Sequence, residues 1–184
     1  MSTKRNFIKQ FFKERQVVGA VSPSTRFLGE KMIENVDFES SNLIVELGPG
    51  TGVFTDLIID RMNDDARLLI FELNDSFYNS LNERIKDPRV KVIHDSAEFI
   101  AKYLNEDERP DCVISSLPLM VFPEKLRNSI VKSSYDVLKP NGYYMQFQYS
   151  LQSKKLLESI YKKVTVKFTL KNFPPAFVYT CQKD

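Results

Sequence analysis

The segment Glu46–Gly52 reads Glu-Leu-Gly-Pro-Gly-Thr-Gly, and its three alternating glycines follow a short apolar run. That run, Asn42–Leu47, predicts a buried strand, and the apolar spacing from about Val53 to Met62 predicts a helix. Glycines at the joint let the backbone turn tightly and pass close to a ligand, because they carry no Cβ. A strand, a glycine turn and a helix in this order are typical of a parallel sheet wound with helices.

The rest of the chain repeats this alternation. Further strands are predicted at Arg67–Glu72, Val90–His94, Asp111–Ser116, Tyr143–Tyr149, Val164–Leu170 and Ala176–Cys181. Helices are predicted after a cap at Asn74 or Asp75, at Glu98–Tyr103, from Pro123 to about Leu138, and at Gln152–Tyr161. We therefore expect an α/β fold: a Rossmann-like, seven-stranded, mostly parallel sheet with helices on both faces and a C-terminal antiparallel hairpin. It forms one domain over residues 1–184, with a helical leader (1–36) and a cofactor-binding core (37–184).

Composition disfavours several classes of function. A single histidine, His94, argues against a zinc site or a His-based triad, and the two cysteines lack metal-ligand spacing. We expect Cys112 and Cys181 to be buried, reduced thiols, and we expect no metal. No apolar run is long enough for a signal peptide or a membrane span, so we expect a cytoplasmic protein.

The spacing of the glycines identifies the class of ligand. A dinucleotide fingerprint G-x-G-x-x-G would need glycine at Val53 or at Thr55, and no lysine follows as a phosphate loop requires. Carboxylates instead mark successive strand ends, with Glu46 before the glycines, Glu72 after the second strand and Asp95 after the third. A carboxylate can accept hydrogen bonds from both ribose hydroxyls or from the amine of adenine. The pattern predicts S-adenosylmethionine as the cofactor, held by Glu46, Gly48, Pro49, Gly50, Gly52, Thr55, Glu72, Leu73, Asp95, Ser96, Ala97, Ser115 and Leu117.

With these motifs placed, the chain resembles the class I methyltransferases, and among them the small bacterial phospholipid N-methyltransferases that methylate phosphatidylethanolamine. The resemblance covers nearly the whole chain. Besides the glycine loop, it rests on Gly19–Ser24, Ser116–Leu119, Val137–Gly142, Gln146–Tyr149 and Asn172–Tyr179. It implies methyl transfer from S-adenosylmethionine to a lipid amine. Tyr149, at the end of the fifth strand, is our candidate for the residue that orients the amine.

The ribosomal RNA adenine dimethylases are the nearest competing family, with a related leader and a similar loop. Their fourth-strand signature is Asn-Leu/Ile-Pro followed by an aromatic residue that stacks on a flipped base. Here Ser115 or Ser116 stands near the asparagine position and Leu119 at the aromatic position. Nucleic acid is therefore the disfavoured partner, and adenine N6-methylation of ribosomal RNA stays the alternative, together with methylation of a soluble small molecule.

The ends of the chain suggest an anionic partner. Residues 1–36 carry seven basic and three acidic side chains, and residues 151–184 carry seven basic and two acidic ones. Within residues 4–15, Phe7, Ile8, Phe11 and Phe12 share one side of a helical wheel. Such a helix suits the headgroup boundary of an anionic phospholipid membrane, and it equally suits packing over the active site. We expect a peripheral membrane association, and the oligomeric state stays open.

Overall fold

The computed structural model describes residues 26–184. The predicted amphipathic helix at residues 4–15 and the segment Gly19–Ser24 lie outside the described residues. In chain order the helices are α2 (Arg26–Ile33), α3 (Val53–Ile59), α4 (Asp75–Arg84), α5 (Glu124–Val137) and α6 (Lys154–Ile160), and the short 3₁₀ segments are η1 (Ala97–Tyr103), η2 (Leu119–Val121) and η3 (Leu151–Ser153). The strands are β1 (Leu43–Leu47), β2 (Arg67–Phe71), β3 (Val90–Ile93), β4 (Cys112–Ser115), β5 (Tyr143–Gln148), β6 (Lys163–Thr169) and β7 (Ala176–Gln182).

The seven strands form one sheet in the order β3-β2-β1-β4-β5-β7-β6. The first five strands pair in parallel, and β7 pairs antiparallel with both β5 and β6. This confirms the Rossmann-like, mostly parallel sheet and its C-terminal hairpin. The strand order reverses between β1 and β4, and a wound sheet of this kind binds its ligand in the crevice at that point.

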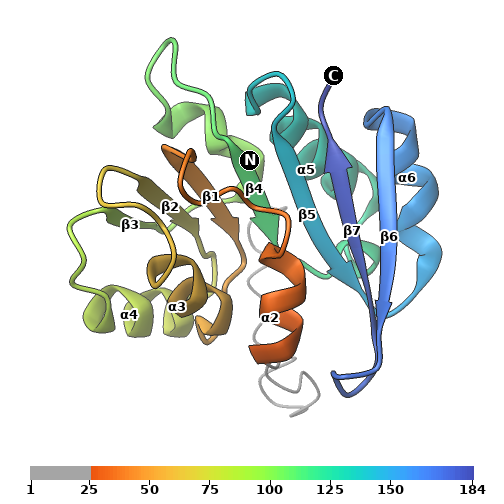
Figure 1. Cartoon of the computed structure of the whole chain (residues 1–184), viewed down its shortest axis with the longest axis horizontal. Coiled ribbons are helices and arrows are strands. Elements are labelled where there is room, and N and C mark those ends of the chain that lie inside the picture. The colour runs from red at the N-terminus through yellow and green to blue at the C-terminus, as the bar shows by residue number, and fades with distance from the viewer. Residues whose placement is uncertain (1–25) are drawn as a thin grey trace.

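Helices cover both faces of the sheet (Figure 1). One face packs under α2 and α3, where Leu28, Met32, Phe54 and Ile58 are buried. The other face packs under η1, α5 and α6, where Ile100, Ile130, Val131 and Leu157 are buried. Strands covered on both sides are mostly apolar, as in the fully buried run Leu43–Leu47, where Glu46 is the one polar side chain.

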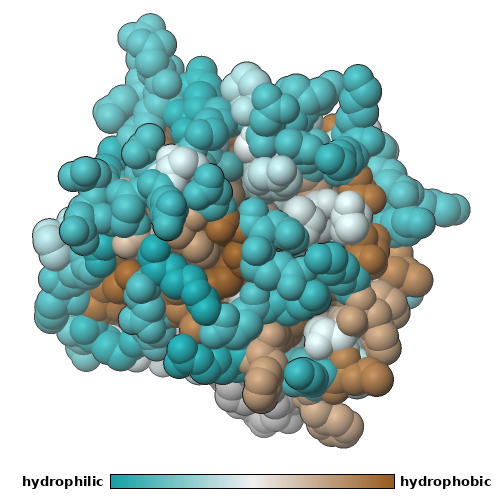
Figure 2. Space-filling model, viewed as in Figure 1, coloured by the Kyte–Doolittle hydropathy of each residue, from teal (hydrophilic) through white to brown (hydrophobic). Residues whose placement is uncertain are grey.

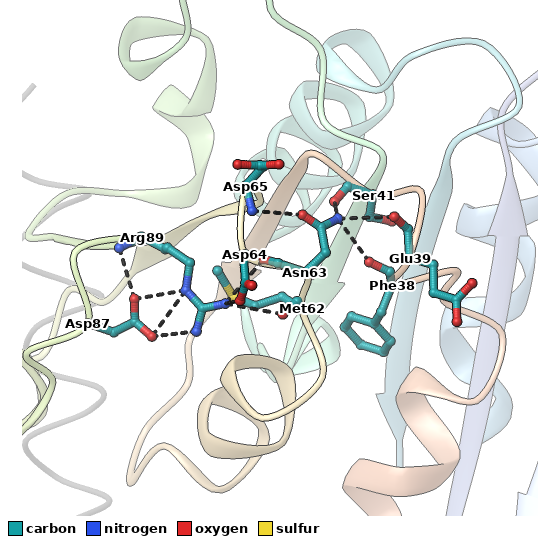
Figure 3. A network of polar contacts seen from close by, with 9 residues as sticks. All are labelled: Phe38, Glu39, Ser41, Met62, Asn63, Asp64, Asp65, Asp87 and Arg89. Carbon is teal, nitrogen blue, oxygen red and sulfur yellow. Dashed lines mark hydrogen bonds and ion pairs between the residues drawn. The ribbon is translucent and has the colours of Figure 1, made fainter.

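The edge where the parallel strands begin is held by polar contacts between loops (Figure 3). The Asn63 side-chain amide donates to the carbonyls of Phe38, Glu39 and Ser41 at 2.9–3.2 Å. Arg89 donates to the carbonyls of Met62 and Asn63 and pairs with Asp87. These contacts tie the segment before β1 to the loops before β2 and β3. They therefore hold the starts of these strands in place, at the edge of the sheet opposite the binding edge.

Two elements differ in detail from the sequence-based expectation. The helix predicted at Glu98–Tyr103 is a 3₁₀ segment with non-helical dihedral angles at Phe99. There the Glu98 carbonyl accepts from the Ser133 hydroxyl of α5 at 3.1 Å. In a regular α-helix this carbonyl would instead accept from a backbone N–H of the same helix. The helix predicted at Gln152–Tyr161 begins with the 3₁₀ turn η3, and α6 follows it.

Candidate functional site

The glycine turn after β1 lies directly beside the segment after β4. Gly48 has φ +65°, which side chains with a Cβ rarely adopt, and a Cβ built there would lie 2.4 Å from Leu117 Cδ2. Only glycine therefore allows the two loops to approach this closely. Gly50 also has positive φ, at +58°, but a Cβ there would meet nothing within 4 Å. Its backbone N–H donates to Glu72 Oε2 at 3.2 Å.

Glu72 follows β2 and joins the glycine turn to the start of α4. Besides the bond from Gly50, its Oε1 accepts from the backbone N–H of Asn74 at 2.8 Å. Asn74, one of the two predicted caps, is the cap of α4 and accepts from the N–H groups of Ser76 and Phe77. Glu72 is only 2% exposed, and burial raises its pKa from 4.5 to about 7. A buried carboxylate at a strand end is suited to binding paired hydroxyl groups.

Asp95 follows β3 and is oriented by two hydrogen bonds. Its Oδ1 accepts from the Ser96 N–H at 2.8 Å, and its Oδ2 accepts from the Tyr103 hydroxyl at 2.9 Å. Ser96 in turn caps η1, because its Oγ accepts from the Glu98 N–H. Tyr103 packs edge-to-face on Phe71, so the Asp95 carboxylate is fixed at the edge of the sheet.

A cavity at this edge brings seven of the predicted residues together. Its lining includes Gly48, Glu72, Leu73, Asp95, Ser96, Ala97 and Leu117. Phe71, Phe122 and Ile130 complete the wall and were not predicted. Polar groups at one side and apolar side chains around them suit a ligand with a hydroxylated ring and a flat heterocycle.

Other predicted residues lie outside this lining. Pro49, Gly50 and Gly52 shape the turn without lining the cavity. Glu46 is fully buried beneath it, where Oε2 accepts from the Thr55 hydroxyl at 2.7 Å. Its Oε1 has no hydrogen-bond partner among the described residues. Burial raises the pKa of Glu46 from 4.5 to about 8, although the bond from Thr55 opposes the shift. Glu46 and Thr55 thus connect β1 to the first turn of α3.

The segment after β4 is held from the neighbouring strand β5. The Leu117 carbonyl accepts from the side-chain amides of Gln146 and Gln148, both at 3.0 Å. Tyr144 donates to Gln146 Oε1 at 2.7 Å and also hydrogen-bonds with Ser115. Ser115 is therefore part of the buried support for Leu117 and does not line the cavity. We call these two hydrogen bonds from Gln146 and Gln148 the clamp. The sequence signal for it is a pair of polar residues, two positions apart, in an otherwise apolar strand.

Tyr149 lies just past the end of β5 and is 42% exposed. Its ring packs edge-to-face on Phe147, with centroids 5.6 Å apart. Partial burial raises the pKa of its hydroxyl, and a hydrogen bond with Asn172 works against that shift. Tyr149 is thus a neutral phenol that can donate or accept a hydrogen bond near the binding edge.

The histidine and the two cysteines are the remaining side chains that could react or bind a metal, and they lie in structural surroundings. His94 stacks on Tyr78 with ring centroids 4.5 Å apart, and its Nε2 lies 3.0 Å from Asp75 Oδ1. Cys112 and Cys181 are buried on β4 and β7. Within residues 26–184, no three His, Cys, Asp or Glu side chains are placed to hold a metal ion. No helix in that range has the length and apolar character needed to cross a bilayer.

Residues 44–142 match a family model described as "Methyltransferase domain". An ornithine lipid N-methyltransferase of Singulisphaera acidiphila is 29% identical over 180 residues, which cover 96% of this chain and 94% of that protein. A ribosomal RNA small subunit methyltransferase A of Borrelia garinii subsp. bavariensis is 29% identical over 134 residues, which cover 70% of this chain. That match spans 46% of the relative, slightly under half of its length.

A solved structure with the same architecture is the N-methyltransferase NodS of Bradyrhizobium japonicum, in complex with S-adenosyl-l-homocysteine. It aligns with a TM-score of 0.65 at 8% identity and covers 86% of this chain and 85% of that chain. At this identity the likeness concerns the fold, and it agrees with the strand order described above.

Proposed function

The chain belongs to the methyltransferase-domain family, and from this membership we propose that it methylates the primary amine of a membrane lipid headgroup, with S-adenosylmethionine as methyl donor. The observation that carries the substrate class is the extent of the lipid match. It runs along 96% of this chain and 94% of the ornithine lipid enzyme, whereas the ribosomal RNA enzyme has more than half its length beyond the match.

The residues that line the cavity at the binding edge have the chemistry that the cofactor requires. Glu72 is placed to accept from the ribose hydroxyls, and Asp95 to accept from the adenine amine, with the N–H groups of Ser96 and Ala97 beside it. Leu73, Ala97 and Ile130 supply apolar walls for the heterocycle. Gly48 and Leu117 close the side that faces the reacting end. Glu46 supports the turn from beneath, through its bond with Thr55.

When bound, S-adenosylmethionine would supply a methyl group on a sulfonium: in-line attack on the methyl carbon by the lone pair of a neutral amine would form the carbon–nitrogen bond as the carbon–sulfur bond breaks, with the thioether S-adenosylhomocysteine as leaving group. The protein contributes position and exclusion of water, and orientation alone can supply a large part of such a rate enhancement. The clamp from Gln146 and Gln148 fixes the Leu117 carbonyl beside the reacting end. Tyr149 orients the amine through its hydroxyl, which is neutral at neutral pH as in any tyrosine, and burial raises its pKa further.

Ribosomal RNA is the second candidate substrate, because the rRNA enzyme matches at the same identity over its shorter span. The residue at the base-stacking position argues against it. Leu119, the first residue of η2, is aliphatic and fully buried, so it offers no ring to a flipped base. Phe122, the next aromatic residue along the chain, lines the cofactor cavity.

Labelled methyl transfer tests the proposal. Purified full-length chain is incubated with methyl-labelled S-adenosylmethionine and three separate acceptors: phosphatidylethanolamine vesicles, ornithine lipid vesicles and 16S ribosomal RNA. We expect label in at least one extracted amine lipid and none in RNA, with the two lipid arms identifying the headgroup. Label in RNA alone would overturn the substrate assignment.

A matched pair of tyrosine variants tests the role of Tyr149 in the same assay. Tyr149→Phe removes the hydroxyl at the binding edge, and Tyr143→Phe removes one at the opposite end of the same strand. We expect Tyr149→Phe to lower kcat on lipid at least tenfold. A tenfold loss is smaller than the rate contribution that a positioned acid or base typically makes. Tyr143→Phe should leave kcat unchanged, and equal rates for all three proteins would remove Tyr149 from the mechanism.

A further inference from the structure

Large apolar side chains are exposed along one border of the described structure. Val121, Leu151, Phe168, Leu170 and Phe173 are each at least 40% exposed, and we call them the apolar rim. Leu170 and Phe173 are the most exposed, at 75% and 85%. Single exposed apolar residues are ordinary, but a continuous group marks a surface that meets a partner.

The sheet topology places the apolar rim at the binding edge. Since β7 is antiparallel to both β5 and β6, those two strands run in the same direction. The loops after β5 and after β6 therefore leave the sheet at the edge that holds the cofactor cavity. Figure 1 shows the β6–β7 loop projecting there, and Figure 2 shows hydrophobic residues gathered over the same corner. η2, which carries Val121, contacts η3, which carries Leu151.

Local contacts fix the conformation of the β6–β7 loop, residues 170–175, which we call the tip. Asn172 is 4% exposed and donates to the Pro174 carbonyl at 2.8 Å, and the Lys171 N–H donates to Thr169 Oγ1 at 3.3 Å. Phe168 packs on Phe177 with ring centroids 4.9 Å apart. Asn172 is buried, whereas its neighbour Phe173 projects into solvent. Asn172 also hydrogen-bonds with Tyr149, which joins the tip to the amine-orienting residue.

Lysines lie on the elements that carry the apolar rim. Lys154 and Lys155 begin α6, directly after η3, and Lys167 and Lys171 flank the end of β6, although Lys154 pairs with Glu158 and Lys167 with Glu34. Lys155 is exposed at the start of α6, and Lys171 lies in the tip with its Nζ 5.7 Å from the centre of the Phe27 ring. Apolar side chains that insert, surrounded by lysines, suit the interface of an anionic bilayer, where both contributions act together.

We propose that the apolar rim docks on an anionic lipid bilayer, with Leu170 and Phe173 inserted among the headgroups and acyl chain ends. Docking in this way brings the cavity mouth and Tyr149 to the membrane surface, so that a lipid amine reaches the methyl donor without leaving the bilayer. The consequence for catalysis rests on the proposed lipid substrate, whereas the docking itself does not.

A single tryptophan reports the docking directly, because the chain contains none. Phe173→Trp places the probe in the tip, and Asp107→Trp places a control in the exposed loop before β4, at the opposite edge. Each protein is titrated with vesicles of phosphatidylglycerol and phosphatidylcholine that carry brominated acyl chains. We expect lipid-dependent quenching and a blue shift for Phe173→Trp and neither for Asp107→Trp.

Two results would overturn the docking. Emission of Phe173→Trp that stays unquenched at every lipid concentration would exclude insertion. Emission that is already blue-shifted without lipid, and does not respond to it, would assign the surface to another segment of this chain or to a second copy.

A double variant separates the docking from the proposed reaction. Leu170→Ser with Phe173→Ser should lower the vesicle-bound fraction at least tenfold and should lower methyl transfer to vesicle lipid. Its affinity for S-adenosylhomocysteine and its activity on detergent-dispersed lipid should match the parent, which shows that the fold is intact. Lipid methylation without insertion would refute the docking alone. Insertion without methylation of any amine lipid would refute the proposed function alone.

Discussion

Among single residues, Glu72 matters most for the proposed cofactor site. Its two oxygens hold the glycine turn and the start of α4, and its position at the end of β2 faces the cavity. Glu72→Gln keeps the shape and one acceptor oxygen but removes the charge-assisted bonds to the ribose. Such a bond contributes about 1.5–3 kcal/mol, so we expect affinity for S-adenosylmethionine to fall about 10- to 100-fold in titration calorimetry.

The control for this variant is Glu106→Gln, which changes an exposed carboxylate in the loop before β4. It should bind the cofactor like the parent protein. Unchanged affinity in Glu72→Gln would mean that the ribose lies elsewhere and that Glu72 only braces the turn.

The sequence identified Glu72 and Asp95, which follow strands, but missed Phe71 within β2 and side chains that come from η1 and α5. Glu72 and Asp95 directly follow apolar runs, and parallel strands bring such positions to one edge without further information. Tyr103 and Ile130 reach the site from η1 and α5, and their contact depends on how those elements pack. Ser115 also lies at the end of a strand, but its side chain faces the core, because successive side chains along a strand point to opposite faces of the sheet.

At the scale of elements, the glycine turn and the segment after β4 form one unit. Gly48→Ala would add strain from positive φ, about 1–2 kcal/mol, and would also press on Leu117. Gly50→Ala would add only the strain, since nothing lies within 4 Å of its added Cβ. We therefore expect urea denaturation to show the larger loss of unfolding free energy for Gly48→Ala. Equal losses would indicate that the two loops do not touch.

The order of the last two strands also belongs to this scale. The sequence predicts a terminal hairpin, but chain order alone leaves open which of its strands pairs with β5. The structure places β7 inside and β6 at the border. Burial gives the physical reason, because β7 is mostly buried whereas β6 alternates between exposed and half-buried positions. The lysines of β6 are compatible with an edge strand, since charge there discourages pairing with other chains.

At the scale of the whole molecule, two buried carboxyl groups couple stability to pH. Burial raises the pKa of Glu46 to about 8 and that of Glu72 to about 7, so both bind a proton more tightly in the folded chain. This contribution is fully present below the unfolded value of 4.5 and is lost as pH rises through 7 and 8. We expect the free energy of unfolding to fall between about pH 5 and pH 8.5, by about 1.4 kcal/mol for each pKa unit at most.

Glu46→Gln isolates the larger part of this effect. The amide oxygen can still accept from Thr55, but the side chain no longer titrates. The variant should show a flatter dependence of unfolding free energy on pH in urea denaturation, whereas Glu106→Gln should keep the slope of the parent. A slope that Glu46→Gln leaves unchanged would mean that Glu46 is ionised in the folded protein.

We expect the cavity between the ends of β1, β2, β3 and β4 to hold S-adenosylmethionine. A crystal structure with S-adenosylhomocysteine tests this directly. It should show the ribose within hydrogen-bond distance of Glu72, the adenine beside Asp95, and the sulfur near Gly48 and Leu117. Ligand bound elsewhere, for example in the open groove lined by Phe27, Lys31, Val36, Thr169 and Lys171, would contradict it.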